Sequence, residues 1–242
     1  MRRVNKNRKK LVIAGIFLAV LLLLAVLLSV RIKTVKVSGN ERYTQEQIEA
    51  MIFDTKLSRN PVYCYYQYRF RPHKTIPFVE DYKIVFRSPV NVEIITYEKS
   101  VVGYVSYMNS LMYFDKDGII VESTNEKLTG IPMITGLRFG HIVLHKPLPV
   151  EDVRIFDEIL NLTQVLEMYD IKADRIDFNS QKEATLTVDN LKVELGGNAQ
   201  INGKISELRD ILNTYTELSG TLYLDTYDET NSNPSYRFEQ DE

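Results

Sequence analysis

Cysteine and histidine are scarce in this chain. Cys64 is the one cysteine, and only three histidines occur among 242 residues. A single cysteine can form neither an internal disulfide nor a CxxC metal site. We therefore expect a fold held by apolar packing, with no metal and no cofactor.

Acidic residues are absent from residues 1–10, which carry six lysines and arginines. That segment holds six of the 30 bases and none of the 32 acids, so residues 11–242 carry 24 bases against 32 acids. Nucleic-acid binding needs a basic surface, and this balance is acidic. We predict no nucleic-acid partner.

Charge is also missing from residues 11–30, where only Gly15 and Ser29 interrupt an apolar run. A helix of this length spans about 30 Å, the thickness of a bilayer core. The alternative is a cleaved signal peptide, whose apolar region is shorter and ends in small residues. We predict a transmembrane helix in the lipid bilayer of the cell membrane. The basic residues 1–10 should stay in the cytoplasm, which places residues 31–242 outside.

Residues 32–97 predict a small α+β unit. A short strand is expected over 32–37. Thr44 then begins a helix, because Thr44 and Gln47 have the spacing of a capping box. Two further strands are expected at 81–86 and 90–94, the second with apolar and polar residues in alternation.

The segment 58–74 is rich in tyrosine and arginine. Such a composition suggests a nucleic-acid or membrane-surface site. The alternative, which we favour, is a second helix or loop that packs its tyrosines on the sheet while their hydroxyl groups reach water. Because the segment should lie outside the cell, lipid contact is the functional alternative.

The rest of the chain alternates between strand and helix patterns, so the fold class is α+β with a mixed, β-rich second part. The turn dipeptides Asp117-Gly118 and Asp189-Asn190 mark two hairpins. The polar, acidic residues 228–242 predict a disordered tail. The expected elements are a strand at 101–105, hairpins at 111–121 and 184–195, helices at 151–169 and after Gly196-Gly197, and a last strand at 221–225.

Catalytic and metal-binding patterns are weak. Asp115 to Gly118 begins like a calcium loop, but the later ligand spacing fails and a hairpin turn fits better. His141 and His145 lack the glutamate of a zinc helix and are expected in a surface loop. A Cys64–histidine pair stays open, with nothing else to support it. We predict that the chain is not an enzyme and takes no small-molecule substrate.

The order of these elements resembles a known family. Residues 32–40 followed by Tyr43-Thr44 resemble the opening of a POTRA domain, and 76–80, 85–89, 92–94 and 97–99 are similar to the strand-turn-strand of the FtsQ/DivIB cell-division proteins. Residues 131–136 are similar to a short proline-containing strand of that family's second domain. The resemblance implies a POTRA domain at 31–100 and a β domain at 101–227.

The resemblance also implies a function. FtsQ/DivIB proteins connect early and late division proteins at the septum by binding FtsL and FtsB/DivIC-type single-pass partners. In that family a partner segment adds alongside the last strand. An edge strand offers unpaired backbone groups for such an addition, unless the tail covers it. The matching partner-binding residues here are Thr221, Leu222, Tyr223, Leu224, Asp225 and Tyr227.

Other classes of function are kept as alternatives. A POTRA-containing factor for polypeptide or cell-envelope assembly would need a pore-forming barrel, whereas the second part contains helices. A membrane-anchored cell-wall enzyme would need a convergent set of catalytic side chains. A receptor-like sensor would need an internal signalling domain, and residues 1–10 are too few.

Overall fold

The computed structural model describes residues 6–215, 218–231 and 235–241, with side chains from residue 10 onward. The chain is α+β and divides into two compact units, Met1–Glu98 and Lys99–Glu242. We call them unit 1 and unit 2. The division falls two residues before the boundary expected from sequence.

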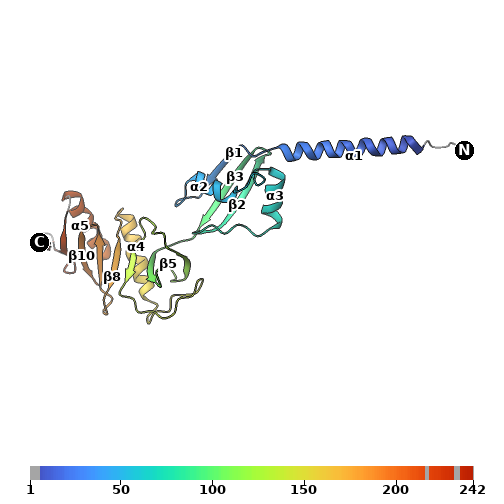
Figure 1. The fold of residues 1–242 in the computed structure, drawn as a ribbon. Coiled ribbons are helices and arrows are strands. Elements are labelled where there is room, and N and C mark those ends of the chain that lie inside the picture. Colours follow the sequence, from blue (N-terminus) through green and yellow to red (C-terminus); the bar gives the residue numbers. More distant parts are fainter. Residues whose placement is uncertain (1–5, 216–217, 232–234, 242) are drawn as a thin grey trace. The chain divides into compact units, whose positions relative to one another are not determined.

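Unit 1 begins with a long helix, α1 (Lys6–Ser29), drawn in blue in Figure 1. Its apolar side chains are exposed, and it is the one helix in the described part of the chain that is long and apolar enough to cross a membrane. The basic segment 1–10 is partly helical, because α1 starts at Lys6, and residues 1–5 lie outside the described residues.

Unit 1 continues with a three-stranded sheet in the order β1-β3-β2 (Figure 1). Strand β3 lies in the middle, parallel to β1 and antiparallel to β2. Its elements are β1 (Thr34–Ser38), α2 (Gln45–Ile52), α3 (Pro61–Phe70), β2 (Val79–Ser88) and β3 (Asn91–Glu98).

Local signals start both short helices of unit 1. Thr44 and Gln47 form the predicted capping box of α2, which satisfies two free amide groups at the helix start. Asn60 caps α3 by accepting hydrogen bonds from Val62 N and Tyr63 N, and Pro61 supplies a favourable φ at the first helical position.

The core of unit 1 lies between its helices and its sheet. Ile48 and Ile52 of α2 pack with Cys64 of α3 against the strands. The strands contribute the apolar residues Val35, Val79, Tyr82, Ile84, Val92 and Ile94.

Unit 2 is built on a nine-stranded mixed sheet in the order β12-β11-β10-β9-β8-β7-β4-β5-β6. Its strands are β4 (Gly103–Tyr107), β5 (Ser110–Phe114), β6 (Ile120–Thr124), β7 (Met133–Thr135), β8 (Arg175–Phe178), β9 (Ala184–Val188), β10 (Leu191–Gly196), β11 (Gly220–Tyr223) and β12 (Arg237–Gln240).

Two helices of unit 2 connect parallel neighbouring strands. Helix α4 (Ile155–Met168) lies between β7 and β8, and α5 (Ile201–Thr214) lies between β10 and β11. Parallel neighbours require such crossovers. Both helices bury apolar residues in one core with the inner face of the sheet, including Ile159, Leu208 and Leu222.

Most elements expected in unit 2 are present. Antiparallel pairing of β5 with β6 and of β9 with β10 confirms the two hairpins, and Asp189 has the left-handed φ that its turn needs. Strand β8 was not expected. The prediction of a disordered tail at 228–242 is wrong for β12, whereas residues 232–234 and 242 lie outside the described residues.

Candidate partner-binding edge

The residues predicted to bind a partner lie on and just after β11. Leu222 and Leu224 are buried in the core of unit 2, while Tyr223 is half-buried and Asp225 exposed. Successive side chains of a strand alternate between its two faces. The predicted direction of these four side chains is therefore confirmed.

The prediction that β11 is a free edge is wrong. Strand β10 pairs with β11 on one side and β12 pairs with it on the other, antiparallel, with Leu222 opposite Phe238. The structure instead confirms the alternative, in which a strand of the C-terminal tail, β12, covers β11. Within the described residues, β12 is the outer strand at this end of the sheet.

Side chains and backbone hold β12 in place. The Tyr223 hydroxyl donates to Glu239 Oε2 at 2.9 Å, and the Arg237 guanidinium lies 3.8 Å from the centre of the Tyr223 ring. Gly220 has φ +144°, and a Cβ built there would overlap the carbonyl oxygen of Glu239. The close approach of β12 therefore depends on a glycine at this position.

Two other residues predicted to bind a partner, Tyr227 and Asp225, interact with other residues of their own unit. Tyr227 lies against α5, where a Cβ on Gly203 would overlap its ring. Asp225 carries charge beside the buried Lys204, whose ammonium group donates to Leu195 O at 2.6 Å. Burial lowers the pKa of Lys204, and the Asp225 carboxylate opposes that shift.

The hydrogen bonds of β11 determine which groups of β12 remain open. Leu224 N bonds to Glu194 O on the β10 side, whereas Asp241 N bonds to Ser219 O on the β12 side. Bonding direction alternates along an antiparallel strand, so Arg237 and Glu239 bond toward β11. The backbone N–H and C=O groups of the alternate residues, Phe238 and Gln240, point to the open edge.

Phe238 places an apolar side chain beside that open edge. It lies opposite Leu222, so it continues the core-facing side of the sheet, yet 39% of its surface is exposed. Tyr236 packs against the same core, and its buried hydroxyl group has no hydrogen-bond partner among the described residues. The sequence analysis missed β12, although the spacing of Tyr236 and Phe238 is that of one face of a strand.

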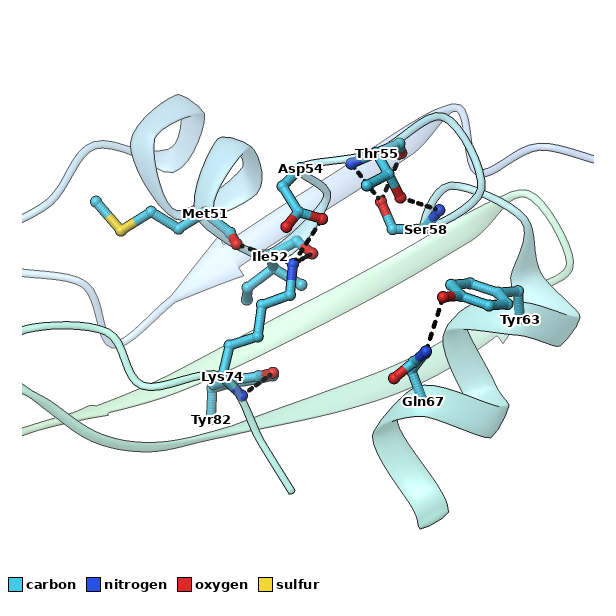
Figure 2. Close-up of polar contacts among 9 residues, drawn as sticks. All are labelled: Met51, Ile52, Asp54, Thr55, Ser58, Tyr63, Gln67, Lys74 and Tyr82. Atoms are coloured by element: carbon cyan, nitrogen blue, oxygen red, sulfur yellow. Dashed lines mark hydrogen bonds and ion pairs between the residues drawn. The ribbon is translucent and has the colours of Figure 1, made fainter. Parts of the chain in front are cut away.

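Unit 1 contains a cleft of about 230 Å³ between the end of α2 and α3. Figure 2 shows polar contacts of residues around it. Lys74 Nζ donates to Ile52 O at 2.8 Å and to Met51 O at 3.3 Å, and it pairs with Asp54 at 2.7 Å. A cation favours the carbonyl end of a helix, so Lys74 caps α2. The hydrogen bond from Lys74 lowers the pKa of Asp54.

The titratable groups around this cleft are engaged in structural contacts. His73 stacks between Tyr68 and Tyr82, and its Nδ1 lies 2.6 Å from Asp81, which lowers the pKa of that carboxyl group. Burial raises the pKa of the Cys64 thiol to about 11. A thiol that stays protonated at neutral pH is a poor nucleophile.

The other candidate sites of the sequence analysis resolve as turns and loops. Asp115 Oδ1 accepts from Asp117 N and Ile119 N, which makes a tight turn rather than a calcium site. His141 and His145 are exposed in a loop, as predicted. Among the described residues no group of three or more histidines, cysteines or carboxylates is placed to hold a metal ion.

Helix α3 forms where the sequence predicted a second helix or loop, and two of its four tyrosines pack as expected. Tyr68 contacts the core of unit 1, and the Tyr65 ring lies edge-on against Phe86 of β2, with ring centroids 5.8 Å apart. Tyr63 and Tyr66 are exposed on α3, so the favoured interpretation is wrong for these two residues. No protein-family model matches the chain, and no curated protein matches it.

Proposed function

We propose that the chain is a membrane-anchored scaffold of the FtsQ/DivIB type, which links early and late division proteins at the bacterial septum. Its partners are FtsL and FtsB/DivIC-type single-pass proteins, and it works by non-covalent binding. The observation that carries this proposal is an open strand edge at the C-terminal end of unit 2, on a chain whose α1 is long and apolar enough to cross a membrane.

Charge and element order support the resemblance. The six bases of residues 1–10 would keep the N-terminus of α1 in the cytoplasm, and residues 31–242 would then lie outside. Unit 1 has the order strand, helix, helix, strand, strand, so α3 fills the segment that the sequence left undefined. This order supports a POTRA domain in unit 1.

Partner binding proceeds by strand addition to β12. A partner strand would pair with the outward backbone groups of Phe238 and Gln240, as in other cases of β-augmentation. An apolar side chain on that strand would cover the exposed face of Phe238. Tyr223 acts indirectly, because its hydroxyl group and ring hold Glu239 and Arg237 of β12.

The membrane tether makes weak edge contacts sufficient. A partner held in the same membrane meets the edge at a raised effective concentration, so avidity exceeds the affinity of the isolated contact. A strand of four residues offers few backbone hydrogen bonds, which suits an interaction that must be reversible during division.

The test compares two proline variants of β12. Proline removes a backbone donor: Gln240→Pro removes one that points outward, and Glu239→Pro removes one that bonds to β11. With the full chain in nanodiscs and an FtsB/DivIC-type ectodomain as ligand, Gln240→Pro should abolish binding while β12 stays paired in hydrogen exchange. Undiminished binding to Gln240→Pro would rule out strand addition.

The side-chain contribution is tested separately. Phe238→Ala should weaken binding by more than about 1 kcal/mol, roughly fivefold in affinity, if Phe238 is an anchor. Val143→Ala is a matched control, because Val143 is an exposed apolar residue in a loop. In cells, depletion of the protein should produce filaments, and normal septation would contradict the division role.

A further inference from the structure

Helix α3 carries apolar side chains on two opposite sides. On one side Cys64 and Tyr68 pack into that core. On the other side Val62, Tyr66 and Phe70, spaced four residues apart, are exposed by 50%, 47% and 67%. The rings of Tyr66 and Phe70 lie 5.7 Å apart, so they form one continuous surface. We call Val62, Tyr66 and Phe70 the outer face of α3.

A single side chain ties the start of α3 to the end of α1. Asn60 Nδ2 donates to the carbonyl oxygens of Leu27, Leu28 and Val30 at 2.9, 3.2 and 3.0 Å. These are carbonyl groups that the end of a helix leaves without partners. The other end of the same amide, Oδ1, caps α3. Asn60 is buried, with 3% of its surface exposed, so the junction is built into the fold.

This junction sets the depth of α3 relative to a membrane. Leu27 and Leu28 belong to the apolar run of α1, so Asn60 lies where that run ends. Figure 1 shows α3 running across the direction of α1, near the C-terminal end of α1. If α1 crosses the bilayer, α3 lies along the bilayer surface.

The charge of the surrounding segment fits an anionic surface. Residues 55–79 contain no aspartate or glutamate and five lysines and arginines, although the chain beyond residue 10 is acidic. Arg69 and Arg71 are exposed, and neither forms an ion pair with a described residue. Lysine and arginine side chains close to an anionic membrane surface are attracted to it. Tyrosine is enriched at the membrane–water interface because its side chain joins an apolar ring to a polar hydroxyl group.

From the apolar outer face, the Asn60 junction and the local positive charge together, we infer that α3 is an interfacial helix. Its outer face lies in the headgroup region of the bilayer that α1 crosses, and Arg69 and Arg71 contact anionic phospholipid headgroups. The contact would hold unit 1 at a fixed tilt on the membrane. This inference depends on α1 as the membrane anchor but not on the identity of any division partner.

The test exploits the absence of tryptophan from the chain. Tyr66→Trp places a single reporter on the exposed outer face, where the substitution leaves the core untouched. In nanodiscs with brominated phospholipid and a minority of anionic phosphatidylglycerol, the reporter should lie about 5–10 Å into the headgroup boundary, and its emission should shift to the blue and fall at least about twofold.

Tyr97→Trp provides the matched control. Tyr97 is equally exposed, but β3 runs parallel to β1, and Tyr97 lies six residues beyond Asn91, the partner of Thr34 at the start of β1. At 3.3 Å per residue it is roughly 20 Å further from the end of α1. Its emission should not respond to brominated lipid.

Two outcomes would overturn the inference. If Tyr66→Trp is quenched no more than Tyr97→Trp, α3 does not touch lipid, and its outer face is left for a protein partner. If adding Arg69→Gln and Arg71→Gln, or omitting the anionic lipid, leaves the quenching unchanged, the headgroup contact is wrong. Co-purification of every variant with the nanodisc shows separately that α1 anchors the chain, and no division partner is present in the assay.

Discussion

Helices α3 and α4 place apolar residues in opposite environments. Helix α4 buries six of its fourteen residues against the core of unit 2. Helix α3 buries only Cys64 of its ten residues, although five of the others are aromatic, and its outer face is exposed. The core of unit 2 accounts for the apolar stripe of α4. The core of unit 1 leaves Tyr66 and Phe70 of α3 exposed, which agrees with the inferred contact between α3 and lipid.

The largest effect expected from this comparison is on stability. Ile159→Ala in α4 removes a fully buried side chain and should destabilise unit 2 by about 2–5 kcal/mol. Tyr66→Ala in α3 should change the stability of unit 1 by less than about 0.5 kcal/mol in detergent, because its ring is exposed. Hydrogen exchange of the amides of β8 and β3 in the full chain measures both. Equal losses would remove the contrast between the helices.

The next effect concerns the junction of α1 with α3. Asn60→Ala removes the cap of α3 and leaves the carbonyl groups at the end of α1 without their donor, a loss of about 1–3 kcal/mol. Local opening of α3 should then expose the buried Cys64, so the rate of Cys64 thiol labelling at pH 8 should increase as the stability falls.

Asn60→Ser separates the two roles of this residue. The serine hydroxyl group can cap α3, but the side chain is too short to reach the carbonyl oxygens of Leu27, Leu28 and Val30. Thiol labelling of Asn60→Ser should fall between that of the wild type and that of Asn60→Ala. Labelling equal to that of the wild type would mean that the link to α1 contributes nothing to the stability of α3.

Helix α3 and strand β12 differ in how far the sequence predicts them. Asn60-Pro61 is a standard helix start, so α3 could have been predicted, but which side of it faces the core depends on contacts with distant strands. Repeating patterns revealed α4 and the hairpins because burial of one face imposes a period. Strands β8 and β12 have only four residues each, and β12 is polar and exposed, so its pairing comes from β11 rather than from its own composition.

A smaller effect is expected where β12 approaches β11. Gly220→Ala should push β12 away, because a Cβ there overlaps Glu239 O and φ +144° is strained for alanine, at a cost on the order of 1–3 kcal/mol. Amide exchange at Arg237 and Glu239 should accelerate, while β9 and β10 stay protected. Gly197→Ala is the control, since no atom lies within 4 Å of a Cβ at that position. Slow exchange at Arg237 in Gly220→Ala would show that the glycine is not needed.

The smallest effect concerns the polar contacts that surround α3 rather than its outer face. The hydrogen bond with His73 lowers the pKa of Asp81, so Asp81 stabilises unit 1 above its unfolded pKa of about 3.9 and loses this contribution as the pH falls through its folded pKa. Because both side chains are substantially exposed, Asp81→Asn should cost less than about 1 kcal/mol at pH 6. Its difference from the wild type should shrink below about pH 4. Urea titrations followed by the methyl signals of Ile84 measure this, with the exposed Glu80→Gln as control. A difference that persists at pH 2 would mean that Asp81 acts through its shape, and not through the charge that pairs with His73.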